Sequence, residues 1–373
     1  MKVVTVVGTR PELIRLSRVL RRLDEACEHV LVHTGQNYDH LLNQVFFDEL
    51  GLRAPDYLLN VTTSSLGHVL GETLIGTERV LSEERPDAVL VLGDTNSSIA
   101  AVMAKRMRIP VYHMEAGNRC FDENVPEETN RRLVDHVADF NLVYTEHARR
   151  NLLAEGLPAR RILLTGSPMR EVLDAYLDQI TASDVVDRMG LERGEYFLVS
   201  AHREENVDAP ARLQALLHCL REIRRTFGLP VVVSTHPRTR KRLAALDTAA
   251  AQLDGLTFHE PFGFFDYNQL QLSARCVLSD SGTIAEESSV LGFPAVTLRD
   301  SIERPEALDT GSIVMTGLDA AEVVAAVTLV TEASVRPTVP IDYQVADTSE
   351  RVVRFILSTA HRHHAWAGIR PGA

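Results

Sequence analysis

The sequence predicts an α/β fold in which parallel sheets are covered by helices on both faces. Short runs rich in Val and Leu recur along the chain and are apolar at nearly every position, as expected of strands buried on both faces. Amphipathic segments separate these runs, and alternation of strand and helix is typical of a doubly wound sheet. The length of 373 residues exceeds what one hydrophobic core usually serves, so two such domains are predicted.

The apolar runs give the strands in order. The predicted strands are residues 3–8, 29–35, 88–94, 111–117, 140–145, 162–166, 196–202, 229–236, 256–262, 276–282 and 294–300. The first helix follows at 11–25, where Leu13, Leu16, Leu20 and Leu23 fall on one face. The regular alternation of strands and helices is interrupted after residue 168. This interruption predicts an N-terminal domain of 1–168 and a C-terminal domain of 169–348. A final helical stretch, 349–373, is expected to pack back on the first domain.

The composition restricts the class of partner. A net charge of −12 argues against nucleic acid and anionic membranes, because both select a basic surface. The four cysteines lie far apart with no Cys-x-x-Cys pair, so no zinc site is suggested. No run is long enough to span a bilayer, and the apolar run that ends at Gly8 is too short for a secretory signal. We therefore expect a cytoplasmic protein.

Polar residues gather directly after the predicted strands, where ligands of open parallel sheets bind. Gly8, Pro11 and Glu12 are explained by a well-formed helix start. Arg10 is not, because a cation is unfavourable at the positive end of a helix dipole, and it therefore indicates an anion site. The turn of Ser281, Gly282 and Thr283 opens another helix. Together with Arg10 and the Glu-Arg-Pro-Glu stretch that contains Arg304, it predicts a diphosphate clamp.

Carboxylates follow two neighbouring strands. Asp94 ends the run 88–94, and Glu115 follows the next strand. Either residue alone could cap a helix or form a turn, but carboxylates brought into one site can divide acid and base roles between them. Glu127 and Glu128 stand in the first turn of a helix, four residues before Arg131 and Arg132, so spacing alone favours dipole complementarity and surface ion pairs.

Histidines follow two strands of the second half. His202 is followed by Arg203, and His236 ends the run 229–236. Single histidines are usually structural, but their recurrence at strand ends favours a site shared with the first half. The sequence has no Walker loop, no Ser-His-Asp order and no G-x-G-x-x-G after the first strand. P-loop phosphoryl transfer, serine hydrolysis and dinucleotide binding are therefore not supported.

Six motifs in register resemble those of one known family. They are GTRPE, GDT, EAG, PEETNRR, DSGTIAEE and ERPE, and they cover nearly the whole chain. In this order they are similar to the non-hydrolysing UDP-N-acetylglucosamine 2-epimerases. The resemblance implies a GT-B-like fold with an interdomain active site, no added cofactor, a UDP-sugar substrate and a homodimer. It also implies inversion at C2 of the sugar through elimination of UDP to a 2-acetamidoglucal, followed by re-addition.

The resemblance assigns roles to matching residues. It places Asp94, Glu115 and Glu127 as acid/base carboxylates and His202 beside the leaving diphosphate. Phosphate contacts fall on Arg10, Ser281, Gly282 and Thr283. Glu287 matches the carboxylate that holds the ribose hydroxyls, and Tyr267 falls where the family has an aromatic neighbour of uracil. With these, the predicted substrate-binding set also includes Arg15, Arg203, His236 and Arg304.

Three stretches depart from the family pattern. Arg15 replaces a common Lys, which keeps the charge but changes its geometry. Asn37 and Tyr38 stand in a stretch that replaces the Gln-His-Arg-Glu of many bacterial members. Because that stretch contributes to activator binding in those members, activation by substrate is not predicted here. The loop 118–128 looks more like the branch acting on UDP-2-acetamido-2,6-dideoxyhexoses, which makes such a sugar a second candidate substrate. A GT-B glycosyltransferase, a hydrolysing epimerase and a non-catalytic UDP-sugar sensor are also compatible with the sequence.

Overall fold

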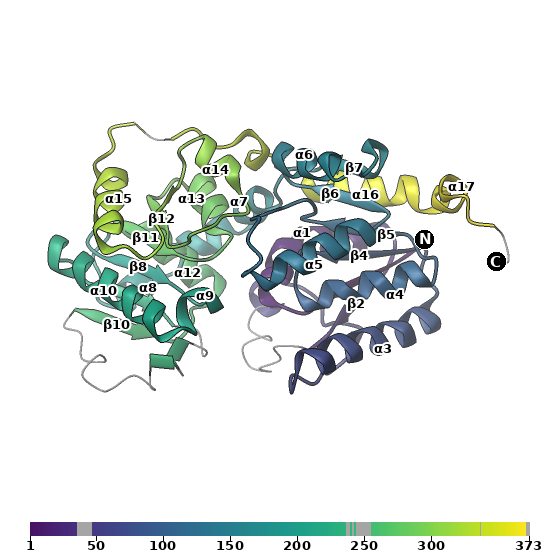
Figure 1. Ribbon diagram of the computed structural model, residues 1–373, viewed down its shortest axis with the longest axis horizontal. Helices are drawn as coiled ribbons and strands as arrows, with labels where there is room; N and C mark the ends of the chain where they lie inside the picture. Colours follow the sequence, from purple (N-terminus) through teal and green to yellow (C-terminus); the bar gives the residue numbers. More distant parts are fainter. Residues whose placement is uncertain (36–46, 236–238, 241, 244–254, 336, 371–373) are drawn as a thin grey trace. The chain divides into compact units, whose positions relative to one another are not determined.

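The chain folds into two compact units in this computed structural model, which describes residues 1–35, 47–235, 239–240, 242–243, 255–335 and 337–370 (Figure 1). The first unit contains residues 1–172 together with 342–373, and the second contains residues 173–341. Each unit is an α/β structure built on a parallel sheet, so the predicted fold class is confirmed.

The first unit has a seven-stranded sheet in the order β3-β2-β1-β4-β5-β6-β7. Its strands are β1 (Lys2–Val7), β2 (Glu28–His33), β3 (Tyr57–Leu58), β4 (Ala88–Leu92), β5 (Val111–Met114), β6 (Phe140–Val143) and β7 (Ile162–Leu164). Its helices are α1 (Arg10–Ala26), α3 (Leu66–Glu84), α4 (Ala100–Arg106), α5 (Pro126–Val137), α6 (Glu146–Ala154), α16 (Thr348–Thr359) and α17 (His363–Ala367). Helix α7 (Met169–Thr181) crosses the boundary into the second unit.

Alternate residues of each strand enter cores on opposite faces of this sheet, as the two-residue period of a strand requires. Val3 and Val7 of β1 pack in a core with residues of α1 and α16, including Leu16 and Val353. Val4 and Val6 of the same strand pack in another core with α3, α4 and α5. The helices thus cover both faces and bury the strands, which explains why the strands read as continuous apolar runs.

The second unit repeats this design with six strands in the order β10-β9-β8-β11-β12-β13. They are β8 (Phe197–Ser200), β9 (Val231–Ser234), β10 (Leu256–His259), β11 (Cys276–Ser279), β12 (Ala295–Thr297) and β13 (Val314–Met315). The helices are α8 (Val185–Arg188), α9 (Glu204–Val207), α10 (Pro210–Phe227), α12 (Phe264–Ser273), α13 (Ile284–Leu291), α14 (Pro305–Asp309) and α15 (Ala320–Glu332). One core joins the sheet to α10 and α15.

Every predicted strand is present, and the sequence missed only short edge strands among the described residues. β3 and β13 contain two residues each, too few to show a period. Each sheet reverses its strand order at one place, between β1 and β4 in the first unit and between β8 and β11 in the second. In doubly wound sheets the ligand site lies at the carboxyl ends of the strands at this reversal.

No helix in the described residues is long and apolar enough to cross a membrane.

Candidate active site

One group of predicted site residues lies in the first unit, at the carboxyl ends of β1, β4 and β5. Arg10 begins α1 after the turn that ends β1, Asp94 follows the end of β4, and Glu115 follows β5 directly. β1, β4 and β5 are consecutive neighbours in the sheet. The structure therefore brings Arg10, Asp94 and Glu115 to one edge of the first sheet, at its point of reversal.

Glu12 joins the loops on either side of this reversal. Its carboxylate is only 1% exposed and accepts hydrogen bonds from the Gly8 backbone N–H at 3.0 Å and the Thr9 hydroxyl at 2.8 Å. It also accepts hydrogen bonds from the hydroxyls of Thr95 and Ser97, which follow β4. Burial raises the pKa of Glu12, although these hydrogen bonds oppose the shift. Glu12, which the sequence explained as part of a helix start, thus also links two turns. One turn precedes Arg10, and the other follows Asp94.

Glu115 is held in a strained position against Arg15. Its backbone φ of 64° lies in the left-handed region, which costs free energy for a residue with a Cβ. Its carboxylate is buried and forms an ion pair with the Nη1 of Arg15 on α1. A Cβ on Gly93 would lie 3.6 Å from the Oε2 of Glu115, so this carboxylate lies beside the turn after β4. Strain at such a residue is typical of a functional site.

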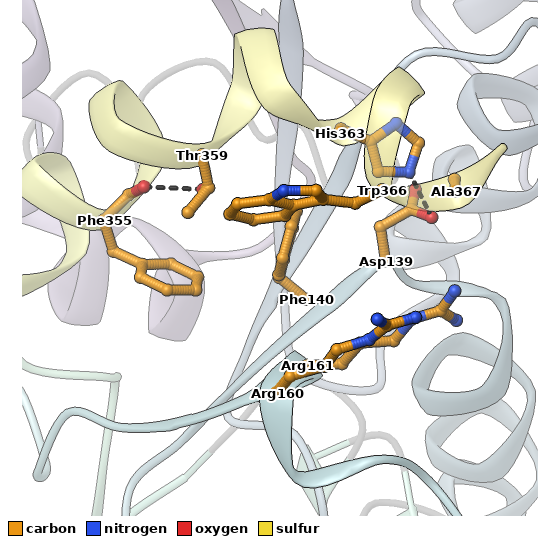
Figure 2. A pocket seen from close by; sticks show the side chains of 9 residues that line it. All are labelled: Asp139, Phe140, Arg160, Arg161, Phe355, Thr359, His363, Trp366 and Ala367. Carbon is orange, nitrogen blue, oxygen red and sulfur yellow. Dashed lines mark hydrogen bonds and ion pairs between the residues drawn. The ribbon is translucent and has the colours of Figure 1, made fainter. Parts of the chain in front are cut away.

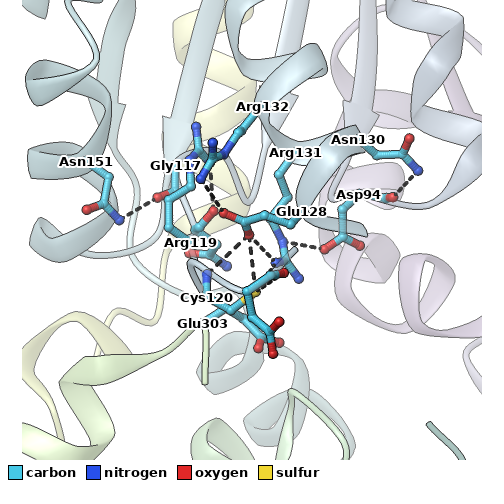
Figure 3. A network of polar contacts seen from close by, with 12 residues as sticks. Asp94, Gly117, Arg119, Cys120, Glu128, Asn130, Arg131, Arg132, Asn151 and Glu303 are labelled. Atoms are coloured by element: carbon cyan, nitrogen blue, oxygen red, sulfur yellow. Dashed lines mark hydrogen bonds and ion pairs between the residues drawn. The ribbon is translucent and has the colours of Figure 1, made fainter. Parts of the chain in front are cut away.

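Arg131 of α5 ties Asp94 to the helix start that carries Glu127 and Glu128 (Figure 3). Its Nε donates to the Oδ2 of Asp94 at 2.7 Å, and its Nη1 donates to the Oε2 of Glu128 at 2.9 Å. Asn130 also donates from its side chain to the backbone oxygen of Asp94 at 2.9 Å. The first turns of α5 are therefore fastened to the end of β4.

Glu127 and Glu128 differ in environment although they are adjacent. Glu128 is buried and accepts hydrogen bonds from the Cys120 backbone N–H, from Arg131 and, at 3.4 Å, from Arg132. Burial opposes ionisation of Glu128, but the bonds from Cys120 and Arg131 outweigh it and lower the pKa. Glu127 is half-buried in the first turn of α5. The expected pair of Glu128 with Arg132 is present, but the sequence missed its shorter contact with Arg131.

Asp135, in the last turns of α5, fixes the loop that follows Glu115. It is fully buried and accepts hydrogen bonds from the backbone N–H of Gly117 and from Arg119 at 2.7 Å. The Nδ1 of His113, on β5, lies 2.9 Å from its Oδ1. Asp135 thus anchors chain on both sides of Glu115. No local pattern predicts this role, because a single Asp within an amphipathic helix reads as a solvated residue.

Another group of predicted site residues lies in the second unit, at the carboxyl ends of β8 and β11, and is centred on Asp280. This buried carboxylate accepts hydrogen bonds from the backbone N–H groups of His202, at 3.1 Å, and Arg203, at 3.0 Å. It also accepts one from Asn206 at 3.1 Å, and its Oδ1 lies 3.4 Å from the Nδ1 of His202. The predicted His202 and Arg203 are therefore positioned by a residue that was not predicted.

Ser281, Gly282 and Thr283 form the turn between β11 and α13, as expected. The hydroxyls of Ser281 and Thr283 lie 3.0 Å apart. A Cβ on Gly282 would lie 2.5 Å from the Oε1 of Glu303 and 3.1 Å from the Nη1 of Arg304. Only glycine fits there without a shift of its neighbours. This crowding places the turn directly against a buried group of charged side chains.

That buried group contains two arginines and two glutamates. Arg304 donates from Nε to Glu286 at 3.0 Å and from Nη1 to Glu303 at 3.3 Å, and Glu303 also pairs with Arg299. Arg203 approaches Glu303 at 3.4 Å and donates to the backbone oxygen of Asp280 at 3.2 Å. Arg304 is buried. Its described contacts support the turn of Gly282, and direct binding of substrate by Arg304 stays a prediction.

Tyr267 and Glu287 also belong to the second unit. Glu287 lies in the first turn of α13 and accepts a hydrogen bond from the side chain of Gln271, on α12, at 2.7 Å. Tyr267 is on the same helix as Gln271, and burial together with the charge of Glu287 raises its pKa. The structure thus places these two predicted residues in one environment.

Three residues singled out from the sequence lie outside the described residues, namely His236, Asn37 and Tyr38. In the described part of the chain, no group of three or more His, Cys, Asp or Glu side chains is arranged to hold a metal ion.

Two Rossmann-like units, with carboxylates at the strand ends of one and a crowded Ser-Gly-Thr helix start at those of the other, define a protein of the GT-B class. A family model described as UDP-N-acetylglucosamine 2-epimerase matches residues 21–357. The chain belongs to this family, which confirms the resemblance drawn from the six motifs.

Named relatives share about a third of their residues with this chain. The UDP-N-acetylglucosamine 2-epimerase of Methanocaldococcus jannaschii is 36% identical over 327 residues, covering 85% of this chain and 88% of the relative. The UDP-2,3-diacetamido-2,3-dideoxy-D-glucuronate 2-epimerase of Pseudomonas aeruginosa is 35% identical, with 85% and 88% covered.

Solved structures agree with this assignment. A UDP-N-acetylglucosamine 2-epimerase from Rickettsia bellii is 45% identical with a TM-score of 0.91, covering 98% of both chains. The Methanocaldococcus jannaschii enzyme in complex with UDP-GlcNAc and UDP also has a TM-score of 0.91, at 34% identity, covering 96% of this chain and 100% of the other. Phytolacca americana UGT2 with UDP-2fluoro-glucose and pterostilbene is 12% identical with a TM-score of 0.60, a likeness of fold alone.

Proposed function

We propose that this chain interconverts UDP-N-acetylglucosamine and UDP-N-acetylmannosamine without hydrolysing them. The observation that carries the proposal is the pair of arginine-bound carboxylates, Asp94 and Glu115, at the ends of neighbouring strands. The similarity to an enzyme solved with UDP-GlcNAc and UDP supports the same substrate.

The chemistry needs carboxylates because C2 of the sugar has no adjacent carbonyl and is not acidic. A base removes the C2 proton while the bond from C1 to the UDP oxygen breaks, which gives a 2-acetamidoglucal and UDP. UDP then adds back to C1 as an acid delivers a proton to the opposite face of C2. We assign these acid and base roles to Asp94, Glu115 and Glu127, and such proton transfers typically contribute about 10²–10⁴-fold to the rate.

The departing UDP must stay bound for the return step. We assign this task to the second unit, with the Ser281–Thr283 turn and Arg203 at the phosphates and His202 beside the leaving oxygen. Arg10 and Arg15, in the first unit, are also assigned to substrate binding, as the family resemblance implies. Glu287 is assigned to the ribose hydroxyls, and Tyr267 to the uracil. Preorganised donors at a leaving phosphate stabilise the charge that develops there.

NMR of the purified protein with UDP-N-acetylglucosamine in D2O tests the proposal. Deuterium at C2 of both epimers, with the UDP-sugar intact, is expected. Epimerisation without label at C2 contradicts elimination, and release of free N-acetylmannosamine identifies a hydrolysing enzyme instead. Loss of UDP-sugar only when an acceptor is present identifies a glycosyltransferase.

A second candidate substrate is a UDP-2-acetamido-2,6-dideoxyhexose. The loop between Glu115 and Glu127 carries Phe121, which is 71% exposed and has a φ of 55°. An exposed apolar side chain in this loop favours a methyl group at C5 of the sugar over a hydroxymethyl group. A side-by-side comparison of kcat/KM for the two substrates decides between them, and replacement of Phe121 by Ser narrows the difference if the loop contacts the sugar.

We also propose that the protein is cytoplasmic, as expected from its sequence, and that it forms the homodimer that the family resemblance implies. Exposed Leu66 and Ile75 on α3 supply apolar surface for such an interface. Light scattering is expected to give twice the chain mass of 41.4 kDa. A Leu66→Glu/Ile75→Glu variant that remains dimeric excludes an interface through either of these two side chains.

A further inference from the structure

A pocket of about 340 Å³ opens in the first unit, at the edge of the sheet opposite the candidate active site (Figure 2). It is lined at the amino ends of β6 and β7, whereas Asp94 and Glu115 follow carboxyl ends. Strands rise about 3.3 Å per residue, so the four-residue β6 alone separates the two edges by roughly 10 Å. The volume is at the small end of the range for small-molecule sites.

Aromatic side chains form one side of this pocket. The ring of Phe140 lies at the centre, 5.3 Å from the ring of Phe355 and 6.4 Å from that of Trp366, and both meet it edge to face. Trp366 contributes to the lining yet is 51% exposed. Large exposed aromatic surface beside a pocket is unfavourable in water and suits the stacking of a ligand ring.

Two adjacent arginines, Arg160 and Arg161, also line the pocket (Figure 2). They end the short 3₁₀ turn that precedes β7. Within the described residues neither guanidinium forms an ion pair, although the chain carries a net charge of −12 and most of its buried arginines pair with carboxylates. A pair of uncompensated guanidinium groups is a site for a carboxylate or phosphate.

Asp139, the carboxylate of the pocket, does not neutralise these arginines because it is already engaged. It is buried, forms an ion pair with Lys105, and lies 2.7 Å from the Nε2 of His363. Its second oxygen accepts a hydrogen bond from the Val111 backbone N–H at 3.1 Å. The positive charge of the pocket therefore remains available to a ligand.

We propose that this pocket binds a small aromatic anion, with its ring packed on the three aromatic side chains and its anionic group at the two arginines. The pocket recognises a planar ring that bears a carboxylate or a phosphate. The binding site is separate from the proposed epimerase site and does not depend on that activity.

Trp366 is the only tryptophan of the chain, so its fluorescence reports occupancy of the pocket directly. The full-length protein is titrated with phenyl phosphate and with phenylacetate, which distinguish a phosphate from a carboxylate ligand. Inorganic phosphate and benzyl alcohol serve as the anion alone and the ring alone. We expect either aromatic anion to quench the fluorescence saturably, and at lower concentrations than inorganic phosphate or benzyl alcohol does. The same quenching is expected in the presence of saturating UDP.

The variant R160A/R161A removes the anion site and is expected to weaken this binding by about tenfold or more. The matched control R79A/R150A removes two exposed arginines of the same unit and keeps the affinity of the wild type. Unchanged binding in R160A/R161A, equal binding of benzyl alcohol, or loss of the signal on addition of UDP overturns the proposal.

Discussion

The Nε of Arg131 donates a hydrogen bond to the Oδ2 of Asp94 at 2.7 Å, which fastens helix α5 to the end of strand β4. The same guanidinium satisfies the buried Glu128 at 2.9 Å. One side chain thus orients a proposed catalytic carboxylate and balances a structural one.

Replacement of Arg131 by Ala is expected to lower both activity and stability. It leaves Glu128 buried without its closest cation, a loss that typically costs roughly 3–5 kcal/mol, and it releases Asp94. Arg131→Lys keeps the charge but cannot donate to both carboxylates in one plane, so kcat falls while much of the stability is kept. Epimerisation rates and urea denaturation measure these effects. The control is Arg132→Ala, at the exposed neighbouring arginine. If Arg132→Ala and Arg131→Ala have the same kcat, the contact of Arg131 with Asp94 has no role in activity.

The three proposed acid/base carboxylates are expected to be separately essential. Asp94→Asn, Glu115→Gln and Glu127→Gln each preserve shape but cannot transfer the proton, so kcat falls by about 10²–10⁴-fold with a small change of KM. Exchange of the C2 hydrogen with D2O, followed separately from each epimer, shows which step each variant has lost. Glu123→Gln in the loop before Glu127 is the matched control, and a Glu127→Gln variant with normal turnover removes Glu127 from the mechanism.

Gly282→Ala is expected to weaken UDP binding by about tenfold or more, since its Cβ would meet the Oε1 of Glu303 at 2.5 Å. Glu303 is held by Arg299 and Arg304, so the turn must move instead. Calorimetric titration with UDP measures the loss. Gly71→Ala, inside α3 with no atom within 4 Å of the new Cβ, is expected to leave UDP binding unchanged and to stabilise the protein by up to about 1 kcal/mol. Unchanged affinity in Gly282→Ala would show that the turn does not hold the phosphates.

The stability of the protein is expected to carry a contribution from Glu12 that declines as pH rises. Burial raises the pKa of Glu12 in the folded state, so the folded protein holds this proton more tightly than the unfolded chain does. The contribution is complete below the unfolded pKa of about 4.3 and is lost as pH rises through the folded pKa. Glu12→Gln removes this pH-dependent contribution. The free energy of unfolding of the variant minus that of the wild type is therefore expected to increase as pH rises above about 4.3. Urea denaturation between pH 4.5 and 7.5 tests this, with the exposed Glu25→Gln on the same helix giving a curve parallel to the wild type.

The sequence predicted residues whose position follows from the strand pattern, and it failed where partners are distant in the chain. Asp94 and Glu115 were found because they end apolar runs. Glu12 looked like an ordinary helix-start residue, since its partner Ser97 lies 85 residues away. Asp280 also ends an apolar run, but its role was missed because its partners His202 and Arg203 are distant in the sequence. Asp135 carries no local signal, because it accepts a hydrogen bond from a distant loop.

Glu127 shows what spacing cannot provide. Its position after a proline and four residues before an arginine is fully accounted for by helix formation, so only the resemblance of the motifs singled it out. The structure adds that its helix is tied to Asp94 through Arg131 and Asn130. A link between a helix start and a strand end that are more than thirty residues apart depends on the tertiary fold.

The return of α16 to the first unit determines how the chain can be divided. Val352, Val353 and Ile356 belong to the same core as Leu13 and Leu16 of α1. In terms of connectivity, the second unit is an insertion within the first, and no single cut separates two complete domains. Residues 1–172 alone would leave one face of their sheet partly uncovered, whereas residues 173–341 form one continuous segment of the chain.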